Sequence, residues 1–224
     1  MGTWDTIDAA GTSARQYVTG AETPGRPGVV LFHAWWGLDG DVTAYADRLA
    51  AAGFAVAAPD LVAGKVATTV EQAEQLTEGA DDALADAVAL AAVDGLAARL
   101  GPDARLAAIG FSFGAAWSIW CAAERDRIAA SIVYYGTMLG GSLARASVPV
   151  LGHFAASDPY ETDEGVAAFE EALRAAGRDV TIHRYPDTGH WFAEPSREAY
   201  SPQAADLAFT RTVDFLRNRL ASDG

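Results

Sequence analysis

Short apolar runs alternate with amphipathic segments along almost the whole chain. Several of the runs are nearly continuous in apolar residues, as strands are in a parallel sheet that is covered on both faces. They lie at Gly28–His33, Phe54–Ala58, Arg105–Ile109, Ile128–Tyr135, Val148–Ala155 and Val180–Tyr185. We predict a β-strand at each of these six positions.

The segments between the runs place apolar residues three and four positions apart, which is typical of helices that bury one face. The clearest stripes are Val42, Tyr45, Ala46 and Leu49; Leu84, Val88 and Ala91; and Val166, Phe169 and Leu173. Gly177 is placed to end the third helix, and Ser201-Pro202 to begin the last one. Alternating strands and helices predict a single α/β domain over residues 1–224, with a mostly parallel central sheet and helices on both faces.

Charge and cysteine content exclude several classes of protein. The 224 residues include 16 Lys and Arg against 30 Asp and Glu, a net charge of −14, which disfavours binding to nucleic acid or to an anionic membrane. No apolar run is long enough to span a bilayer, and residues 1–20 do not have the pattern of a signal peptide. A single cysteine and four scattered histidines give neither a disulfide nor a zinc motif. We expect a soluble, cytoplasmic protein, a monomer or small homo-oligomer, with no metal and no cofactor.

The most informative motif is G-F-S-F-G at Gly110–Gly114. It follows a predicted strand and opens a helix of small residues, which is the context of a nucleophile elbow. The two glycines allow a tight, strained turn that exposes the hydroxyl of Ser112 at the helix N-terminus. We therefore predict that Ser112 is a catalytic nucleophile.

A serine nucleophile needs a histidine base that a carboxylate orients. In this kind of fold the chain order is serine, acid, histidine. Asp158 directly follows the predicted strand Val148–Ala155, and His190 lies in the loop after Val180–Tyr185. Both therefore reach the sheet edge where Ser112 emerges.

Other acidic residues and histidines leave alternatives to this triad. Asp163 and Asp187 are rival carboxylates, but Asp187 is only three residues from His190 and belongs to the same turn, so we prefer Asp158. The remaining histidines are assigned to structure: His33 supports the site, His153 is a hydrogen-bonded core residue and His183 a surface or edge residue.

The loop after the first predicted strand, His33–Gly37, is placed to complete an oxyanion hole. We predict that the backbone N–H groups of Trp35 and Phe113 hold the oxyanion. Together with Trp35, three further tryptophans near these elements predict an apolar substrate pocket, with substrate contacts from Trp36, Trp117 and Trp191. Packing against the elbow helix is the alternative for Trp117.

Four segments of the chain resemble the dienelactone hydrolase family, a compact branch of the α/β-hydrolases. They are HAWWGLDGDVTAYADRLAAAGFAVAAPDL, GFSFGAAW, ASDPYE, and YPDTGHWFAEP with the later FTRTVDFL. The resemblance spans nearly the full length and implies an α/β-hydrolase fold, a hydrolase activity, and a triad of Ser112, Asp158 and His190.

Three positions depart from the founding members of that family. Those enzymes use a cysteine nucleophile where this chain has Ser112, and an early-loop glutamate where it has Ala34. An arginine after the catalytic histidine helps them bind the lactone carboxylate, whereas this chain has Glu194. The first two departures together indicate a serine-nucleophile variant of the family, and we expect Glu194 to repel a carboxylate substrate.

These observations predict a serine-dependent hydrolase of short-chain or aryl carboxylic esters that acts through an acyl-enzyme. A lactonase or dienelactone hydrolase is the nearest alternative, and a non-catalytic binding protein on the same fold is an alternative of another class. Only twelve residues separate Tyr135 from Val148, too few for a cap domain, and residues 62–79 predict one short helix at the rim. We expect a shallow pocket that takes a small ester or lactone.

Overall fold

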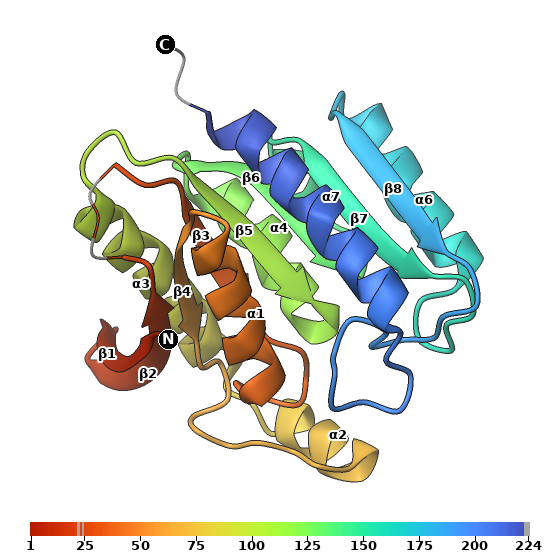
Figure 1. Cartoon of the computed structure of the whole chain (residues 1–224), viewed down its shortest axis with the longest axis horizontal. Coiled ribbons are helices and arrows are strands. Elements are labelled where there is room, and N and C mark those ends of the chain that lie inside the picture. The colour runs from red at the N-terminus through yellow and green to blue at the C-terminus, as the bar shows by residue number, and fades with distance from the viewer. Residues whose placement is uncertain (22, 24, 222–224) are drawn as a thin grey trace.

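One sheet of eight strands runs through the structure, with helices against both of its faces (Figure 1). The computed structural model describes residues 1–21, 23 and 25–221. The strands are β1 (Thr3–Ala9), β2 (Thr12–Thr19), β3 (Gly28–Phe32), β4 (Ala55–Pro59), β5 (Leu106–Phe111), β6 (Ile128–Tyr134), β7 (Val150–Ala155) and β8 (Val180–Tyr185). The helices are α1 (Gly40–Ala51), α2 (Val70–Glu78), α3 (Asp82–Leu100), the 3₁₀ turn η1 (Ser112–Gly114), α4 (Ala115–Glu124), α5 (Gly141–Arg145), α6 (Asp163–Ala175) and α7 (Pro202–Leu220).

The strand order is β1-β2-β4-β3-β5-β6-β7-β8. β2 pairs antiparallel with both β1 and β4, and every other pair of neighbours is parallel. The predicted mostly parallel sheet is therefore confirmed. All six predicted strands are present, and each of their ends lies within two residues of the predicted one.

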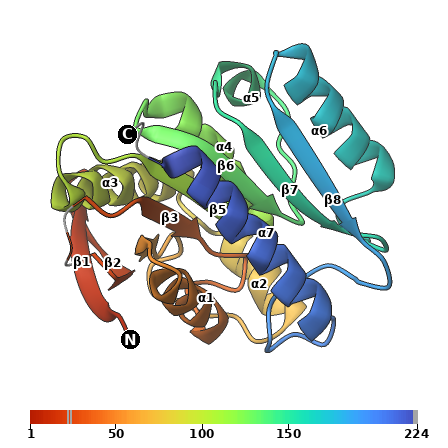
Figure 2. The same cartoon turned by 45° about the horizontal axis from the view of Figure 1, so that its top comes forward.

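Each face of the sheet has its own apolar core, because successive side chains of a strand point to opposite faces. In β3, Val30 and Phe32 pack with α3 and α4, whereas Val29 and Leu31 pack with α1 and α7. Figure 2 shows α1 and α7 together on one side of the sheet and α3, α4 and α6 on the other. The strands β3 to β7 are thus buried on both sides, which explains their continuous apolar runs, whereas the edge strand β8 is partly exposed.

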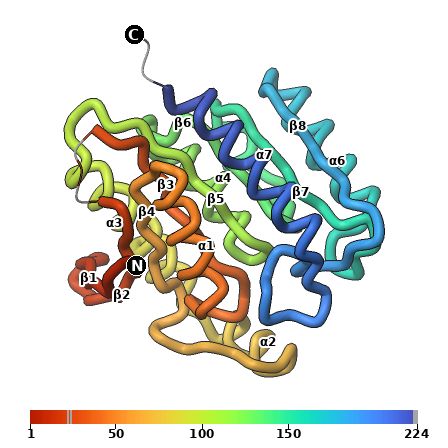
Figure 3. The backbone as a smooth tube through the Cα atoms, in the orientation of Figure 1, coloured from red at the N-terminus to blue at the C-terminus, as the bar shows by residue number. Residues whose placement is uncertain are grey.

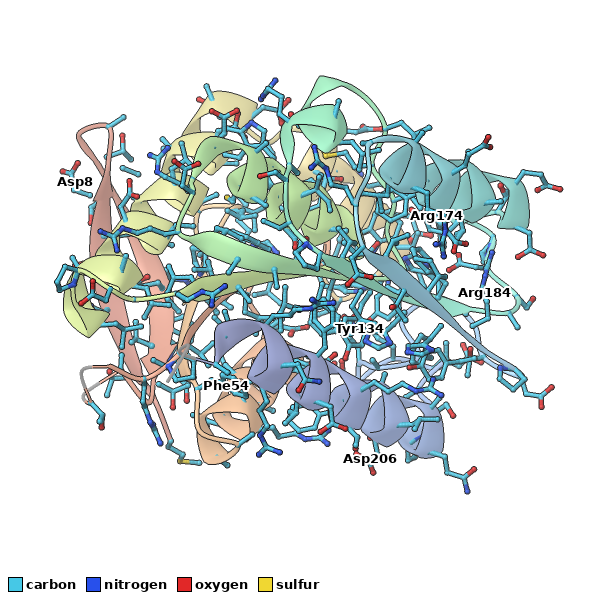
Figure 4. All side chains as sticks on the ribbon, turned by 90° about the horizontal axis from the view of Figure 1, so that it is seen from above. Asp8, Phe54, Tyr134, Arg174, Arg184 and Asp206 are labelled. Carbon is cyan, nitrogen blue, oxygen red and sulfur yellow. The ribbon has the colours of Figure 1, made fainter. Side chains whose placement is uncertain are left out.

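Buried hydrogen bonds cross the core beneath α1 and α7. The hydroxyl of Tyr134, which Figure 4 places between the sheet and α7, lies 2.9 Å from that of Tyr45 and 2.8 Å from Oγ1 of Thr212. His153 bonds to Thr212 through Nε2 and to the Tyr185 hydroxyl through Nδ1, at 3.0 and 2.8 Å. His153 is therefore the hydrogen-bonded core histidine that the sequence predicts.

The hairpin β1–β2 was not among the predicted strands. Its turn places Ala10 and Gly11 at φ +53° and +82°, the left-handed pair that joins two antiparallel strands tightly. Most side chains of β1 are exposed or half-buried. The apolar periodicity is weak here because an edge strand with little burial does not require it.

No cap stands between β6 and β7, where the chain forms a loop and the five-residue α5. The predicted short helix in residues 62–79 is α2. In Figure 3 it lies at the same end of the molecule as the loop between β8 and α7. Within the described ranges, none of the helices is both long and apolar enough to cross a membrane.

Candidate active site

Ser112 stands at a sharp turn between β5 and α4, with its backbone at φ +48° in the left-handed region. The flanking glycines are required by close packing. A Cβ on Gly110 would lie 2.2 Å from the carbonyl oxygen of Gly114, and a Cβ on Gly114 would lie 2.6 Å from that of His33. Strain at a single serine, held by two glycines, is the geometry of a nucleophile elbow. Ser112 is half-buried.

The three residues of the predicted triad form one hydrogen-bonded chain. Oγ of Ser112 lies 2.8 Å from Nε2 of His190, and Nδ1 of His190 lies 2.7 and 2.9 Å from the two carboxylate oxygens of Asp158. Nδ1–H donates to the carboxylate, which leaves Nε2 free to accept the serine proton. The side chains of His190 and Asp158 are 4% and 2% exposed, so water does not compete for this bond.

Asp158 is held as an anion by its neighbours. Burial opposes its charge, but hydrogen bonds from His190 and from the N–H groups of Tyr160 and Glu161 lower the pKa of the carboxyl below its usual value. The rival carboxylates lie elsewhere: Asp163 pairs with Arg184 at 3.0 Å, and Asp187 is exposed in its turn.

The predicted oxyanion loop packs directly against the elbow, since Gly114 meets the carbonyl groups of Phe32 and His33. No side chain caps the start of η1 or of α4, so N–H groups at this helix start are available to an anion. His33 is fully buried, donates from Nδ1 to the Ala34 carbonyl at 2.7 Å and accepts the N–H of Leu61 at Nε2, at 3.0 Å. Burial lowers the pKa of His33, which keeps this supporting residue neutral.

Aromatic side chains surround the triad. The ring centroids of Trp35 and Trp191 are 5.7 Å apart, and both residues are half-buried. Trp36 lies beneath them, 4% exposed and 5.1 Å from Trp191. Trp117 points toward α3, where its Nε1 donates to Asp86 at 3.0 Å. Substrate contact thus remains a prediction for all three tryptophans named from the sequence, and its geometry is most direct for Trp191.

Tyr160 belongs to this site and was missed by the sequence reasoning. Its ring lies 4.9 Å from that of His190 and 5.5 Å from that of Trp35, and the residue is 48% exposed. Its position two residues after Asp158 was the available signal, because its N–H donates to the Asp158 carboxylate at 2.9 Å and keeps the residue beside the site.

Glu194 is buried, at 4% exposure, and its Oε1 accepts the hydroxyl of Tyr135 at 2.8 Å. Burial raises the pKa of Glu194 to about 8, and the charges of Asp39 and Asp41 act in the same direction. Arg197, with Nε 3.8 Å from Oε2, favours the ionised form but does not outweigh burial. An uncharged carboxyl repels nothing, so the structure does not support the expected repulsion of a carboxylate substrate below that pH.

Glu194 makes stability depend on pH. The folded state keeps its proton up to about pH 8, whereas the unfolded chain loses it near 4.5, so the free energy of unfolding falls as pH rises between these values, by at most ~1.4 kcal/mol per unit. We expect Glu194→Gln to flatten that fall in urea unfolding curves from pH 5 to 9. Glu198→Gln, an exposed change in the same loop, is the control. If the free energy of unfolding of the wild type and of Glu194→Gln fell in parallel with pH, the raised pKa of Glu194 would be refuted.

Within the described ranges, no group of three or more His, Cys, Asp or Glu side chains is arranged to hold a metal ion. Cys121 is fully buried in α4, and burial raises the pKa of its thiol, so it is not a competing nucleophile.

Comparisons with known proteins bear on the family and the fold. The sequence model of the dienelactone hydrolase family matches residues 14–220. Protein usf of Aquifex pyrophilus is 30% identical, with 98% of this chain and all of that protein aligned. A Bradyrhizobium protein named "probable 2-oxo-3-(5-oxofuran-2-ylidene)propanoate lactonase" is 27% identical, over 96% of this chain and 93% of its own. The crystal structure of a dienelactone hydrolase-like promiscuous phosphotriesterase from metagenomic libraries superposes with a TM-score of 0.84 at 25% identity, covering 98% of this chain and 99% of that one.

The family match covers most of the chain, and the aligned structure has the same architecture over nearly its whole length. The resemblance drawn from the four sequence segments is therefore confirmed. This chain belongs to the dienelactone hydrolase family and has the α/β-hydrolase fold.

Proposed function

We propose that this protein is a serine-dependent hydrolase of small carboxylic esters. The observation that carries the proposal is the continuous chain of hydrogen bonds from Ser112 through His190 to Asp158. A serine hydroxyl is a weak nucleophile unless a base accepts its proton, and this chain supplies both the base and the group that orients it.

In the proposed mechanism, Oγ of Ser112 attacks the acyl carbon while Nε2 of His190 takes its proton. The N–H groups of Trp35 and Phe113 bind the oxyanion of the tetrahedral intermediate. His190 then gives the proton to the leaving alkoxide, which departs as the alcohol and leaves an acyl-Ser112. Water, activated by His190, attacks this acyl group, and the carboxylic acid is released as Ser112 regains its proton.

Cyclic esters are the second candidate substrates, because a lactone carbonyl undergoes the same attack. A relative aligned over nearly the whole chain is named a lactonase, which favours this reading. A lactone opens without losing its alkoxide as a separate product, so the same residues serve both reactions. Glu194 stands where the resemblance places the arginine that binds the lactone carboxylate in the family. It supplies no cation there, which favours neutral lactones over dienelactone.

The size of the substrate follows from the missing cap. Ser112 and Trp191 are half-buried at the mouth, and the short α5 segment encloses no long acyl chain. We expect kcat/KM for p-nitrophenyl esters to fall steeply beyond a few acyl carbons in a series from acetate to palmitate. A neutral lactone and dienelactone, assayed beside p-nitrophenyl acetate, separate the two candidates. Highest kcat/KM on palmitate, or on dienelactone, would overturn the proposal.

A further inference from the structure

Tyr135, the residue directly after β6, packs against the candidate base, and its neighbour Gly136 packs against the nucleophile turn. Its ring centroid lies 5.0 Å from that of His190. The next residue, Gly136, is packed so closely that a Cβ there would lie 2.6 Å from the carbonyl oxygen of Ser112. The ring of Tyr135 therefore forms part of the surface against which the imidazole rests.

The backbone of Tyr135 is held in an unfavourable conformation. Its φ is +37°, in the left-handed region that bulky side chains avoid, and its N–H donates to the carbonyl of His153 at 2.7 Å. Such strain persists only where surrounding contacts enforce it, and it is concentrated at functional sites. The side chain is fully buried, and its ring centroid lies 5.4 Å from that of Phe192 and 5.9 Å from that of Phe111.

The hydroxyl of Tyr135 has one polar partner in the described structure, the carboxyl of Glu194 at 2.8 Å. Glu194 lies four residues after His190, and a backbone bond from its N–H to the Trp191 carbonyl closes the turn between them. Because Trp191 has φ +64°, this turn too is strained and depends on its contacts. The carboxyl thus connects the end of β6 to the loop that carries the base.

Glu194 also lies next to the loop predicted to form the oxyanion hole. Arg197, 3.8 Å from its Oε2, donates to Asp39 at 2.5 Å and stacks at 4.0 Å over the ring of Trp36. Asp39 in turn caps the start of α1. One buried carboxyl is therefore in contact with the supports of both the base and the oxyanion loop.

We propose that Glu194 is a positioning residue for catalysis, which through the hydroxyl of Tyr135 holds the His190 imidazole in line with Ser112. The proposal rests on the proposed serine mechanism. A misplacement of about 1 Å at a catalytic group costs up to ~10²-fold in rate, so loss of this hydrogen bond should lower the rate at Ser112 without altering the chemistry.

The ionisation of Glu194 should appear in the pH profile. The charged and titratable groups around it are Tyr135, Arg197, Asp39 and Asp41. Burial is the largest effect that opposes the ionised carboxylate, and Asp39 and Asp41 add to it, whereas the Tyr135 hydrogen bond and Arg197 favour it. Because burial prevails, ionisation favours loop conformations in which water reaches the carboxylate. Activity should therefore decline as pH rises through about 8 in the wild type.

The test is the rate at which a fluorophosphonate probe labels Ser112, followed by mass spectrometry at pH 7. We expect Tyr135→Phe and Glu194→Leu to label about 10- to 100-fold more slowly, and Glu194→Gln, whose amide oxygen still accepts the Tyr135 hydroxyl, to label at nearly the wild-type rate. From pH 7 to 9.5, the labelling rate of Glu194→Gln should lack the decline expected for the wild type. Glu198→Gln is the control.

Folding and positioning effects are separated by measuring Tm and KM on p-nitrophenyl acetate for every variant. A fall in kcat with KM and the folded fraction retained supports positioning. Unchanged labelling in Tyr135→Phe, or a Glu194→Gln profile identical to the wild type, overturns it. Failure of the wild type itself to label at Ser112 would instead refute the serine mechanism.

Discussion

Replacing Ser112 by alanine is expected to lower kcat on p-nitrophenyl acetate by ~10⁴-fold or more. In the proposed mechanism the hydroxyl bonded to Nε2 of His190 forms the acyl-enzyme, and among the described residues no other hydroxyl bonds to that nitrogen. The triad acts as a unit, so the remaining His190 and Asp158 contribute little alone. Initial rates and the mass of the fluorophosphonate adduct measure the effect.

Ser147→Ala, at an exposed serine before β7, is the matched control and should leave both readouts unchanged. Ser112→Ala with near-normal turnover would exclude the serine mechanism. A wild-type protein that neither turns over esters nor forms an adduct would favour the alternative of a binding protein on a hydrolase fold.

The arrangement of the three candidate triad residues could be predicted from sequence because it depends on local order. Each of its three residues follows a strand that could be predicted from the sequence, and parallel strands bring their carboxyl ends to one edge of the sheet. Once Ser112 was identified by its two glycines, the order of acid and base left few choices. The hydrogen bonds that join the three residues agree with that reasoning.

The contacts of Glu194 and Trp117 could not be predicted, because they depend on packing between distant segments. Glu194 meets Tyr135 from 59 residues away, and nothing in a loop glutamate indicates that it is buried. Trp117 was expected in the pocket because it follows the elbow closely. Its Nε1 instead donates to Asp86, 31 residues earlier on α3, so the indole points toward that helix. Proximity in sequence gave the right neighbourhood for these side chains but not their orientation.

Asp158→Asn should lower kcat by ~10⁴-fold while leaving the fold intact. The carboxylate accepts Nδ1–H at 2.7 Å, which fixes the tautomer with Nε2 free. An amide can instead donate to Nδ1, and the imidazole then carries its proton on Nε2, where it can no longer accept the proton of Ser112. Steady-state kinetics measures the loss, and circular dichroism checks the fold.

The same change at the two rival carboxylates gives matched controls. Asp163→Asn removes only an exposed ion pair with Arg184, which contributes little to stability. Asp187→Asn keeps a residue that tolerates the left-handed backbone, at φ +56°. Both variants should retain kcat within about twofold, because neither carboxylate bonds to His190 in the described structure. A large loss in Asp187→Asn with little loss in Asp158→Asn would reverse the assignment of the acid, since it would mean that the turn rearranges to bring Asp187 to Nδ1 during catalysis.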